Sequence, residues 1–221
     1  AVSRVIAAKN SLQILECVLF DLEGGVLTLT ASDSETTIRT SLTVENAEGA
    51  GKVAVVGKML LETLKEFSEQ PLTFHIDDQN FGLNITSANG TYSFVGANGN
   101  EYPEMPVEAG ENSFEIAADV LLDAVNKTIF CTADDELRPV MNGICFDMTE
   151  NSLTIVASDG RKLACDTLAN AQISQAGTFI LQKKPAALVK NILAKDHGDV
   201  TIRYSERNAV ITSELYSLNC R

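Results

Sequence analysis

The chain has 221 residues, of which 45% are hydrophobic, and its formal net charge at pH 7 is −13. This length is enough for one large domain or for two domains of ordinary size, and no apolar run approaches the ~20 residues of a membrane span. An acidic chain repels nucleic acid when its charges are spread evenly, so the placement of the 17 lysine and arginine residues matters more than the net charge. Five cysteines without a Cys-x-x-Cys spacing predict reduced thiols in a cytoplasmic protein.

In chain order, the spacing of the apolar residues predicts a few short helices among a larger number of strands. Helical spacing is found in residues 1–8, 58–68, 117–130 and 185–194. Alternation of apolar and polar residues predicts strands at 26–31, 52–57, 72–77, 81–87, 153–158, 177–182, 200–205 and 209–218. Gly24-Gly25 and Glu150-Asn151 separate strand pairs as hairpin turns. The sequence therefore predicts an α+β fold with antiparallel sheets.

One stretch of the sequence is written twice. When "FDLEGGVLTLTASD" (20–33) is shifted by 126 positions onto "FDMTENSLTIVASD" (146–159), seven of fourteen residues are identical. The match extends to "NITS" (84–87) and "VITS" (210–213). Such a period is far too long for a solenoid repeat, so it indicates a duplicated domain. The two copies diverge directly after Asp33 and Asp159.

The duplication also predicts the domain limits. The Pro- and Glu-rich segment 102–113 is the expected boundary, which gives one domain at 1–108 and a second at 109–221. The second copy has a strand and helix start at 113–123 that the first copy lacks, and the first copy continues past the point equivalent to Arg221. We therefore expect the natural protein to extend at both ends.

Catalytic motifs are weak throughout the sequence. His75 and His197 have no partnered serine or cysteine motif, and "GAGKVAVVGKM" (49–59) departs from the spacing of a phosphate-binding loop. The acidic run 134–136 could bind a divalent cation, but an acidic loop that faces water is the more frequent meaning of such a run. The sequence predicts no enzyme, no cofactor and no metal site.

The basic residues follow a clearer pattern, because they recur at matching places on the predicted helices. Lys58 opens one helix and Lys183-Lys184 open its counterpart, although a cation there opposes the helix dipole. Lys65 matches Lys190, and Arg4 matches Lys127. Solvated lysine on an exposed helix face is the ordinary explanation for any one of them. Their repetition in both copies predicts one shared electropositive face for a polyanion.

These features together resemble the bacterial DNA polymerase III β subunits, the sliding clamps. The resemblance is carried by "KNSLQILECVLFDLEGGVLTLTASDSET", "NGICFDMTENSLTIVASDGRKLA" and "NEYPEMP", and it covers essentially the whole chain. It implies tandem DNA-clamp domains, each with antiparallel sheets and two short helices on the inner face, and a third domain that this sequence does not contain. It also implies a non-enzymatic bacterial cytoplasmic processivity factor, a head-to-tail homodimer ring around duplex DNA.

The resemblance further implies three sets of site residues. Contacts to the duplex, without sequence specificity, are expected from Lys9, Lys58, Lys65, Arg138, Lys183 and Lys184. One wall of a groove for short linear motifs of the replicative polymerase, the clamp loader and repair proteins is expected from Met141, Ser158, Gly160, Arg161, Lys162 and Leu163. The dimer interface is expected to include Tyr92 and Phe94. Two alternatives remain open: a tandem-domain protein-binding adaptor that never binds DNA, and an enzyme whose active site lies outside this sequence.

Overall fold

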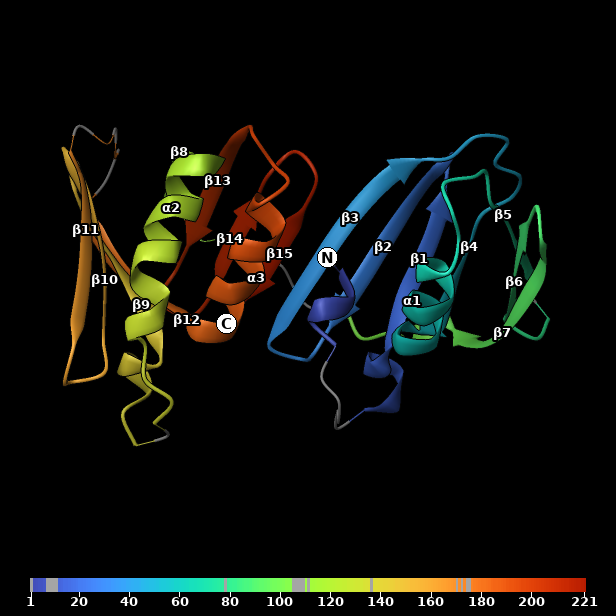
Figure 1. The fold of residues 1–221 in the computed structure, drawn as a ribbon, viewed down its shortest axis with the longest axis horizontal. Coiled ribbons are helices and arrows are strands. Elements are labelled where there is room, and N and C mark those ends of the chain that lie inside the picture. The colour runs from blue at the N-terminus through green and yellow to red at the C-terminus, as the bar shows by residue number, and fades with distance from the viewer. Residues whose placement is uncertain are drawn as a thin grey trace. The chain divides into compact units, whose positions relative to one another are not determined.

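The computed structural model of the chain describes residues 2–6, 12–77, 79–104, 110, 112–135, 137–169, 171, 173 and 176–221. The chain divides into two compact units, one from Val2 to Met105 and one from Pro106 to Arg221. Both units combine antiparallel strands with a few short helices (Figure 1), which confirms the α+β class predicted from the sequence pattern.

The strands of the first unit are β1 (Cys17–Glu23), β2 (Val26–Ser32), β3 (Thr36–Thr43), β4 (Gly51–Val56), β5 (Thr73–Asp77), β6 (Gly82–Ser87) and β7 (Gly90–Asn98). Their order is β5-β6-β7-β4-β1-β2-β3. Helix α1 (Gly57–Lys65) covers this sheet, and its Leu60 joins Phe20, Val53 and Leu83 in the core. Three short 3-10 turns complete the unit: η1 (Val2–Arg4), η2 (Gln13–Glu16) and η3 (Gly99–Glu101).

The second unit contains two sheets. The strands β9 (Gly143–Thr149), β10 (Ser152–Ser158), β11 (Leu163–Ala169) and β12 (Gly177–Gln182) pair in the order β11-β10-β9-β12. The strands β8 (Asn112–Ala117), β13 (Asp199–Tyr204), β14 (Ala209–Thr212) and β15 (Ser217–Cys220) pair in the order β15-β14-β13-β8. The 3-10 turns are η4 (Ile129–Cys131) and η5 (Pro139–Met141).

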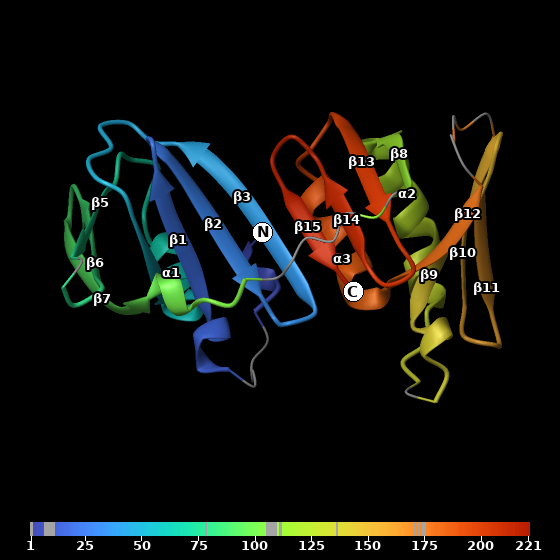
Figure 2. The ribbon, with the colours of Figure 1, turned by 180° about the vertical axis from the view of Figure 1, so that it is seen from behind.

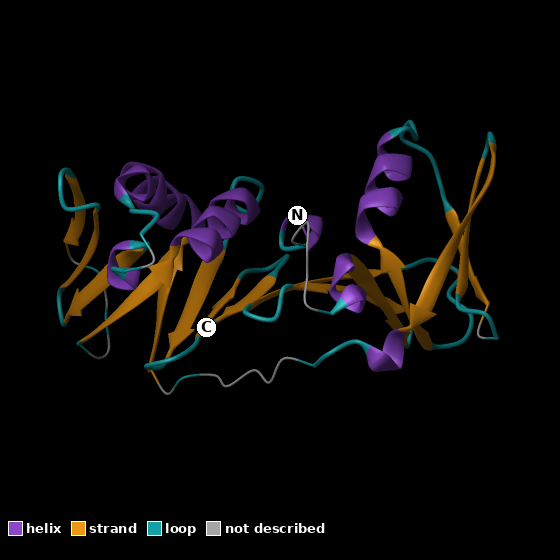
Figure 3. Ribbon diagram, turned by 90° about the horizontal axis from the view of Figure 1, so that it is seen from below, coloured by secondary structure: helices purple, strands orange, loops and turns teal. Residues whose placement is uncertain are grey.

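Helices α2 (Ala118–Thr128) and α3 (Lys183–Leu193) pack side by side on one face of these sheets (Figure 3). Seen from behind, β1 lies nearer the viewer than α1, and β14 and β15 lie nearer the viewer than α3 (Figure 2). In α2 the buried residues Leu121, Ala124, Val125 and Thr128 follow helical spacing, so one stripe of the helix faces the core. Burial of that stripe leaves Asn126 and Lys127 exposed on the opposite face.

The strand register repeats with the sequence. In the first unit Phe20 pairs with Leu29 between β1 and β2, and in the second Phe146 pairs with Ile155 between β9 and β10. Each of these pairs lies 126 residues from its counterpart. The structure thus has the repeated architecture expected of a duplicated domain.

Three sequence-based expectations need correction. The helix expected at 58–68 ends at Lys65, and the strand expected at 209–218 is two strands joined by a turn. That turn forms because the Ser213 hydroxyl accepts a hydrogen bond from the Tyr216 amide at 3.2 Å. Of the helix expected at 1–8, residues 2–6 are described, and only Val2–Arg4 is helical, as a 3-10 turn. After Asp33 and Asp159, where the two sequences diverge, both copies continue into a paired strand, β3 or β11.

Candidate peptide groove and nucleic-acid interface

The hairpin of β10 and β11 holds five of the six residues expected in the groove: Gly160, Arg161 and Lys162 in its loop, which we name the groove loop, and Ser158 and Leu163 at the adjoining strand ends. The Asp159 carboxylate accepts hydrogen bonds from the backbone amides of Arg161 at 2.9 Å and Lys162 at 3.0 Å. These donors hold the pKa of the Asp159 carboxyl below its usual value, with the Lys162 amide as the largest cause. Gly160 has a φ of +85°, a left-handed conformation that glycine adopts without strain. The loop backbone is therefore fixed by its own aspartate.

The same turn exists in the first unit with different side chains. The Asp33 carboxylate accepts hydrogen bonds from the amides of Glu35 at 3.0 Å and Thr36 at 2.7 Å. Ser34 occupies the position of Gly160 and also has a positive φ, +80°. The two copies therefore differ in the chemistry of the side chains on the turn and share its backbone conformation.

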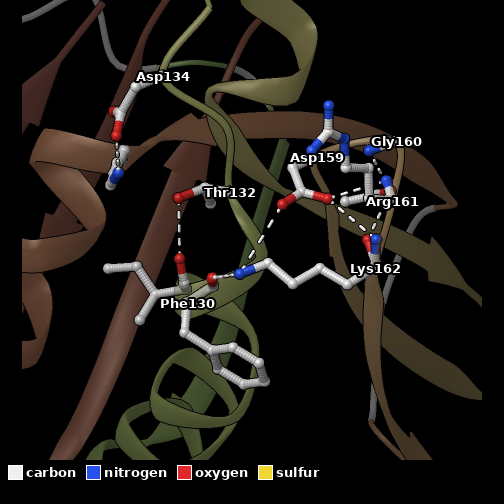
Figure 4. A network of polar contacts seen from close by, with 10 residues as sticks. Phe130, Thr132, Asp134, Asp159, Gly160, Arg161 and Lys162 are labelled. Atoms are coloured by element: carbon white, nitrogen blue, oxygen red, sulfur yellow. Dashed lines mark hydrogen bonds and ion pairs between the residues drawn. The ribbon is translucent and has the colours of Figure 1, made fainter.

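Lys162 is engaged within its own unit. Its Nζ donates to the Phe130 carbonyl at 2.9 Å, lies 5.7 Å from the centre of the Phe130 ring, and is 3.8 Å from the Asp159 carboxylate (Figure 4). Phe130 belongs to η4, directly after α2, where carbonyl groups without helical partners attract cations. Lys162 thereby connects the groove loop to the end of α2.

The described residues 132–135 and 137–142, which include η5, lie beside the first loop. The Asn142 side chain accepts from the Asp135 amide at 2.9 Å and donates to the Asp135 carbonyl at 3.0 Å. The Met141 carbonyl accepts from the Ala133 amide at 2.8 Å. These bonds hold Met141, which is half-buried, in a short closed segment.

Arg138 was expected to face DNA, and the structure places it beside the groove loop. Its Nε donates to the Asp135 carboxylate at 2.8 Å, and this bond is the largest cause that lowers the pKa of Asp135. A Cβ atom on Gly160 would lie 3.2 Å from the Arg138 guanidinium. Arg138 and Gly160, assigned to two different sites from the sequence, are thus neighbours.

The lysines expected to face DNA have unequal surroundings. Lys58 and Lys65 are exposed at the second and last positions of α1, and Lys184 is exposed at the second position of α3. Lys183, at the first position of α3, forms an ion pair with Asp134. Lys9 lies outside the described residues.

The two residues expected at the dimer interface, Phe94 and Tyr92, differ in burial. Phe94 is 8% exposed and packs with Leu83 and Ile85 in the core of the first unit. Tyr92 is 40% exposed, and its ring contacts Phe67 edge to face, with ring centres 5.0 Å apart. Residues 90–95 of β7 pair with β6, whereas β4 pairs with residues 96–98. Within the described strands, one edge of the 90–95 segment is therefore unpaired.

Sequence reasoning missed several exposed apolar residues near the groove loop. Phe130, Leu137, Val140 and Leu163 are 62%, 91%, 65% and 67% exposed. Only Leu163 was expected there. The signal for Leu137 and Val140 was present in the sequence, since "ELRPVM" (136–141) places these two apolar residues around Arg138 and Pro139 in a segment with no helical or strand period.

Three further kinds of feature bear on the expected sites: metal-binding clusters, membrane-spanning helices and cavities. Among the described residues, no group of three or more histidine, cysteine, aspartate or glutamate side chains is placed to hold a metal ion. The described helices are all too short or too polar to cross a membrane. A cavity of about 380 Å³ between β8, α2 and β11 is lined mainly by apolar residues, and it does not include the residues of either expected site.

Comparison with known proteins defines the class of this chain as a tandem-domain clamp fold. A DNA polymerase III beta subunit from Thermotoga maritima matches 100% of the chain and 59% of its own length, with a TM-score of 0.90 and 25% identity. A sliding clamp from Pseudomonas aeruginosa, solved bound to griselimycin, matches 100% of the chain and 60% of its own length, with a TM-score of 0.92 and 23% identity.

The family follows from the sequence comparisons. Residues 1–106 match the model of the N-terminal domain of the DNA polymerase III beta subunit, and residues 115–221 match the model of its central domain. The chain belongs to the DNA polymerase III beta subunit family. The beta sliding clamp of Staphylococcus aureus is 24% identical over 214 residues, which is 94% of this chain and 56% of that relative. The chain thus spans little more than half the length of such relatives.

Proposed function

We propose that this chain is part of a DNA sliding clamp, a non-enzymatic processivity factor that encircles duplex DNA and tethers a replicative polymerase. The observation that carries the proposal is the match to two successive beta subunit domains, over residues 1–106 and 115–221. In this proposal the two domains are 1–108 and 109–221, a third domain completes each subunit, and two subunits close head to tail in the bacterial cytoplasm.

The proposed contact with DNA uses Lys58, Lys65 and Lys184. All three are exposed on helices, and exposed cations attract phosphates without reading the base sequence. This mode of contact suits a protein that must slide. Lys183 and Arg138 contribute less in this proposal, because Asp134 and Asp135 already pair with them.

The proposed partner groove is the surface around the 158–163 loop. Met141 and Leu163 provide apolar contacts, and Gly160 allows close approach of a partner's backbone. The griselimycin complex of the Pseudomonas aeruginosa clamp supports the idea that this fold accepts a compact ligand. Polymerase, clamp loader and repair proteins are the proposed partners, through short linear motifs.

Retention on DNA tests the clamp proposal. The protein expressed from its complete gene is loaded on closed circular DNA and on the same DNA after linearisation, and retention is measured at several salt concentrations. We expect retention on the circle that is lost on linearisation, because the attachment is topological. Equal retention on both forms would contradict the proposal.

A protein-binding adaptor without DNA contact is the second candidate. It is favoured by the net charge of −13 and by the ion pairs that occupy Lys183 and Arg138. An adaptor would bind partner peptides and show no retention on circular DNA.

Leu163→Ala tests the groove that both candidates share. Because the Leu163 side chain is 67% exposed, we expect the substitution to weaken peptide binding and to leave the melting temperature unchanged. Unchanged peptide affinity would remove Leu163 from the groove.

A further inference from the structure

The two cations of the groove loop, Arg161 and Lys162, are adjacent in sequence but differ in their contacts. Lys162 bonds to the Phe130 carbonyl, covers the Phe130 ring and lies beside Asp159. For the Arg161 guanidinium, the structure shows neither a hydrogen bond nor an ion pair with any described residue; its backbone amide alone is bonded, to Asp159. The two residues therefore have different roles open to them.

We propose that Lys162 is a positioning residue, which fastens the 159–163 loop to the end of α2, and that Arg161 is the residue that selects an acidic side chain in the bound peptide. This inference rests on the proposed groove. It separates two residues that sequence reasoning grouped together as partners for acidic or carbonyl groups.

The geometry supports fastening in three ways. The acceptor is a carbonyl in η4, the 3-10 turn that follows α2, so it belongs to a rigid element. The ammonium group interacts with both the carbonyl and the ring of one residue, Phe130, so a single side chain contacts two different groups. Because Asp159 binds the Lys162 amide while its carboxylate also lies near Nζ, the backbone and the side chain of Lys162 are held from the same side.

The first unit provides an internal control for this contact. Its turn has the same aspartate bonds, from Asp33 to the amides of Glu35 and Thr36. At the position equivalent to Lys162 it has Thr36, which is 2% exposed and has no ammonium group. The backbone turn therefore forms without the lysine contact, and that contact is an addition of the second unit.

The exposure of Arg161 and Leu163, on either side of Lys162, indicates which groups the held loop presents to a peptide. Leu163 is 67% exposed and begins β11, so its direction depends on the loop that precedes it. The Lys162 side chain is still 52% exposed, but its ammonium group is bonded to Phe130, so the exposed groups of the loop that have no bonded partner among the described residues are the Leu163 side chain and the Arg161 guanidinium. A peptide with an apolar residue next to an aspartate or glutamate has the matching chemistry.

Amide hydrogen exchange of the 221-residue chain tests the fastening without any ligand. Lys162→Met keeps the aliphatic part of the side chain and removes the ammonium group. We expect it to speed exchange in the segment 160–164 about fivefold, the size expected from loss of one ordinary hydrogen bond. Lys162→Arg keeps a donor and should restore slow exchange, and Arg161→Met should leave it unchanged. Equal exchange in Lys162→Met and the unsubstituted chain would overturn the positioning role.

Peptide binding tests the selection by Arg161. The probes are two fluorescein-labelled pentapeptides, Ser-Leu-Asp-Leu-Gly and Ser-Leu-Asn-Leu-Gly, titrated at low salt against the protein expressed from its complete gene, because residues 1–221 supply one wall of the proposed groove. We expect the unsubstituted chain to prefer the aspartate probe about fivefold, Arg161→Met to lose that preference, and Lys162→Met to weaken both probes while keeping it. A preference that survives Arg161→Met would overturn the selection. If neither probe binds the unsubstituted chain, both the proposed groove and the selection fail, while the exchange result decides the fastening independently.

Discussion

Asp33 and Asp159 cap the same turn in the two units of the chain. Each carboxylate accepts hydrogen bonds from the amides two and three residues further on, and all four distances lie between 2.7 and 3.0 Å. In each turn the residue after the aspartate has a positive φ, +80° at Ser34 and +85° at Gly160. The part of the sequence that the two copies share, up to Asp33 and Asp159, thus encodes the same turn. The residues after the aspartate differ and give the turn different side chains.

Protonation of Asp159 is expected to loosen the loop. Because the folded-state pKa of Asp159 is lowered, its stabilising contribution is fully present above the pKa of an unfolded aspartate, about 3.9, and is lost as the pH falls through the lower folded value. Asp159→Asn should therefore remove this pH dependence. Amide exchange of residues 160–164 between pH 5 and pH 3, corrected for intrinsic rates, measures it. An unchanged pH profile in the variant would contradict the cap.

The hydroxyl of Tyr102 is expected to matter for the first unit. It accepts from the Ser32 amide at 2.9 Å and lies 3.4 Å from the Cys17 carbonyl, and the side chain is 5% exposed. Tyr102→Phe leaves a buried donor without its partner, so the free energy of unfolding should fall by about 1–3 kcal/mol. Urea denaturation measures this, and Tyr92→Phe, at a half-exposed ring, is the control that should change little.

The same residue gives the first unit a sensitivity to alkaline pH. Burial raises the pKa of Tyr102 to about 12. The neutral phenol is therefore favoured by folding, and its contribution is complete below pH 10 and is lost between pH 10 and about 12. Tyr102→Phe should flatten the stability of the first unit in that interval. A profile that falls equally in the variant would assign the loss to other groups.

Phe94 and Tyr92 are expected to respond differently to truncation. Phe94→Ala removes a core ring and should lower the free energy of unfolding by about 3–5 kcal/mol. Tyr92→Ala loses the contact with Phe67 and should cost much less, because its ring is 40% exposed. Denaturation compares the two. Self-association of the complete protein, followed by sedimentation, should weaken in Tyr92→Ala if this strand edge faces a second subunit.

Asp134 is expected to weaken the proposed contact with DNA, because it pairs with Lys183 at the start of α3. Asp134→Asn should release Lys183 for a phosphate, tighten binding of a short duplex about threefold at low salt, and steepen the salt dependence by close to 0.9 in log–log slope. Fluorescence anisotropy at several salt concentrations measures both. Glu206→Gln changes the net charge equally at an exposed turn, and an equal effect there would exclude a specific role for Asp134.

Much of the fold could be predicted because apolar alternation and helical spacing survive in each element that packs against the core. Strands β2 and β10 and helix α2 were found in this way. Strands β3 and β11 were harder to predict because they carry many polar residues, and their pairing depends on the aspartate-capped turn. The strand expected at 209–218 was wrong because Ser213 closes a local turn that a period of two does not reveal.

The residues of the candidate site could be named from the sequence, but the neighbours with which their side chains pair could not. Spacing and resemblance indicated which lysines and arginines to examine, but charge pairing depends on three-dimensional neighbours. Neither the ion pair of Lys183 with Asp134, 49 residues away, nor the bond of Lys162 to Phe130, 32 residues away, has a sequence signature. The position of Arg138 beside Gly160 likewise arises from the bonds between Asn142 and Asp135 that close the loop.

The positive φ at Ser34 and Gly160 has a consequence for how freely the two units can change. Serine at +80° carries backbone strain that glycine would not, so Ser34→Gly is open to the first unit as a stabilising change. The second unit has already adopted glycine, and its hairpin depends on that glycine and on Asp159. Substitutions at Arg161 and Leu163 therefore change the exposed surface of the hairpin and leave in place Gly160, the Lys162 contact with Phe130 and the Asp159 bonds to the backbone amides. The copy with glycine at the positive-φ position is thus also the copy whose exposed side chains are proposed to bind a partner.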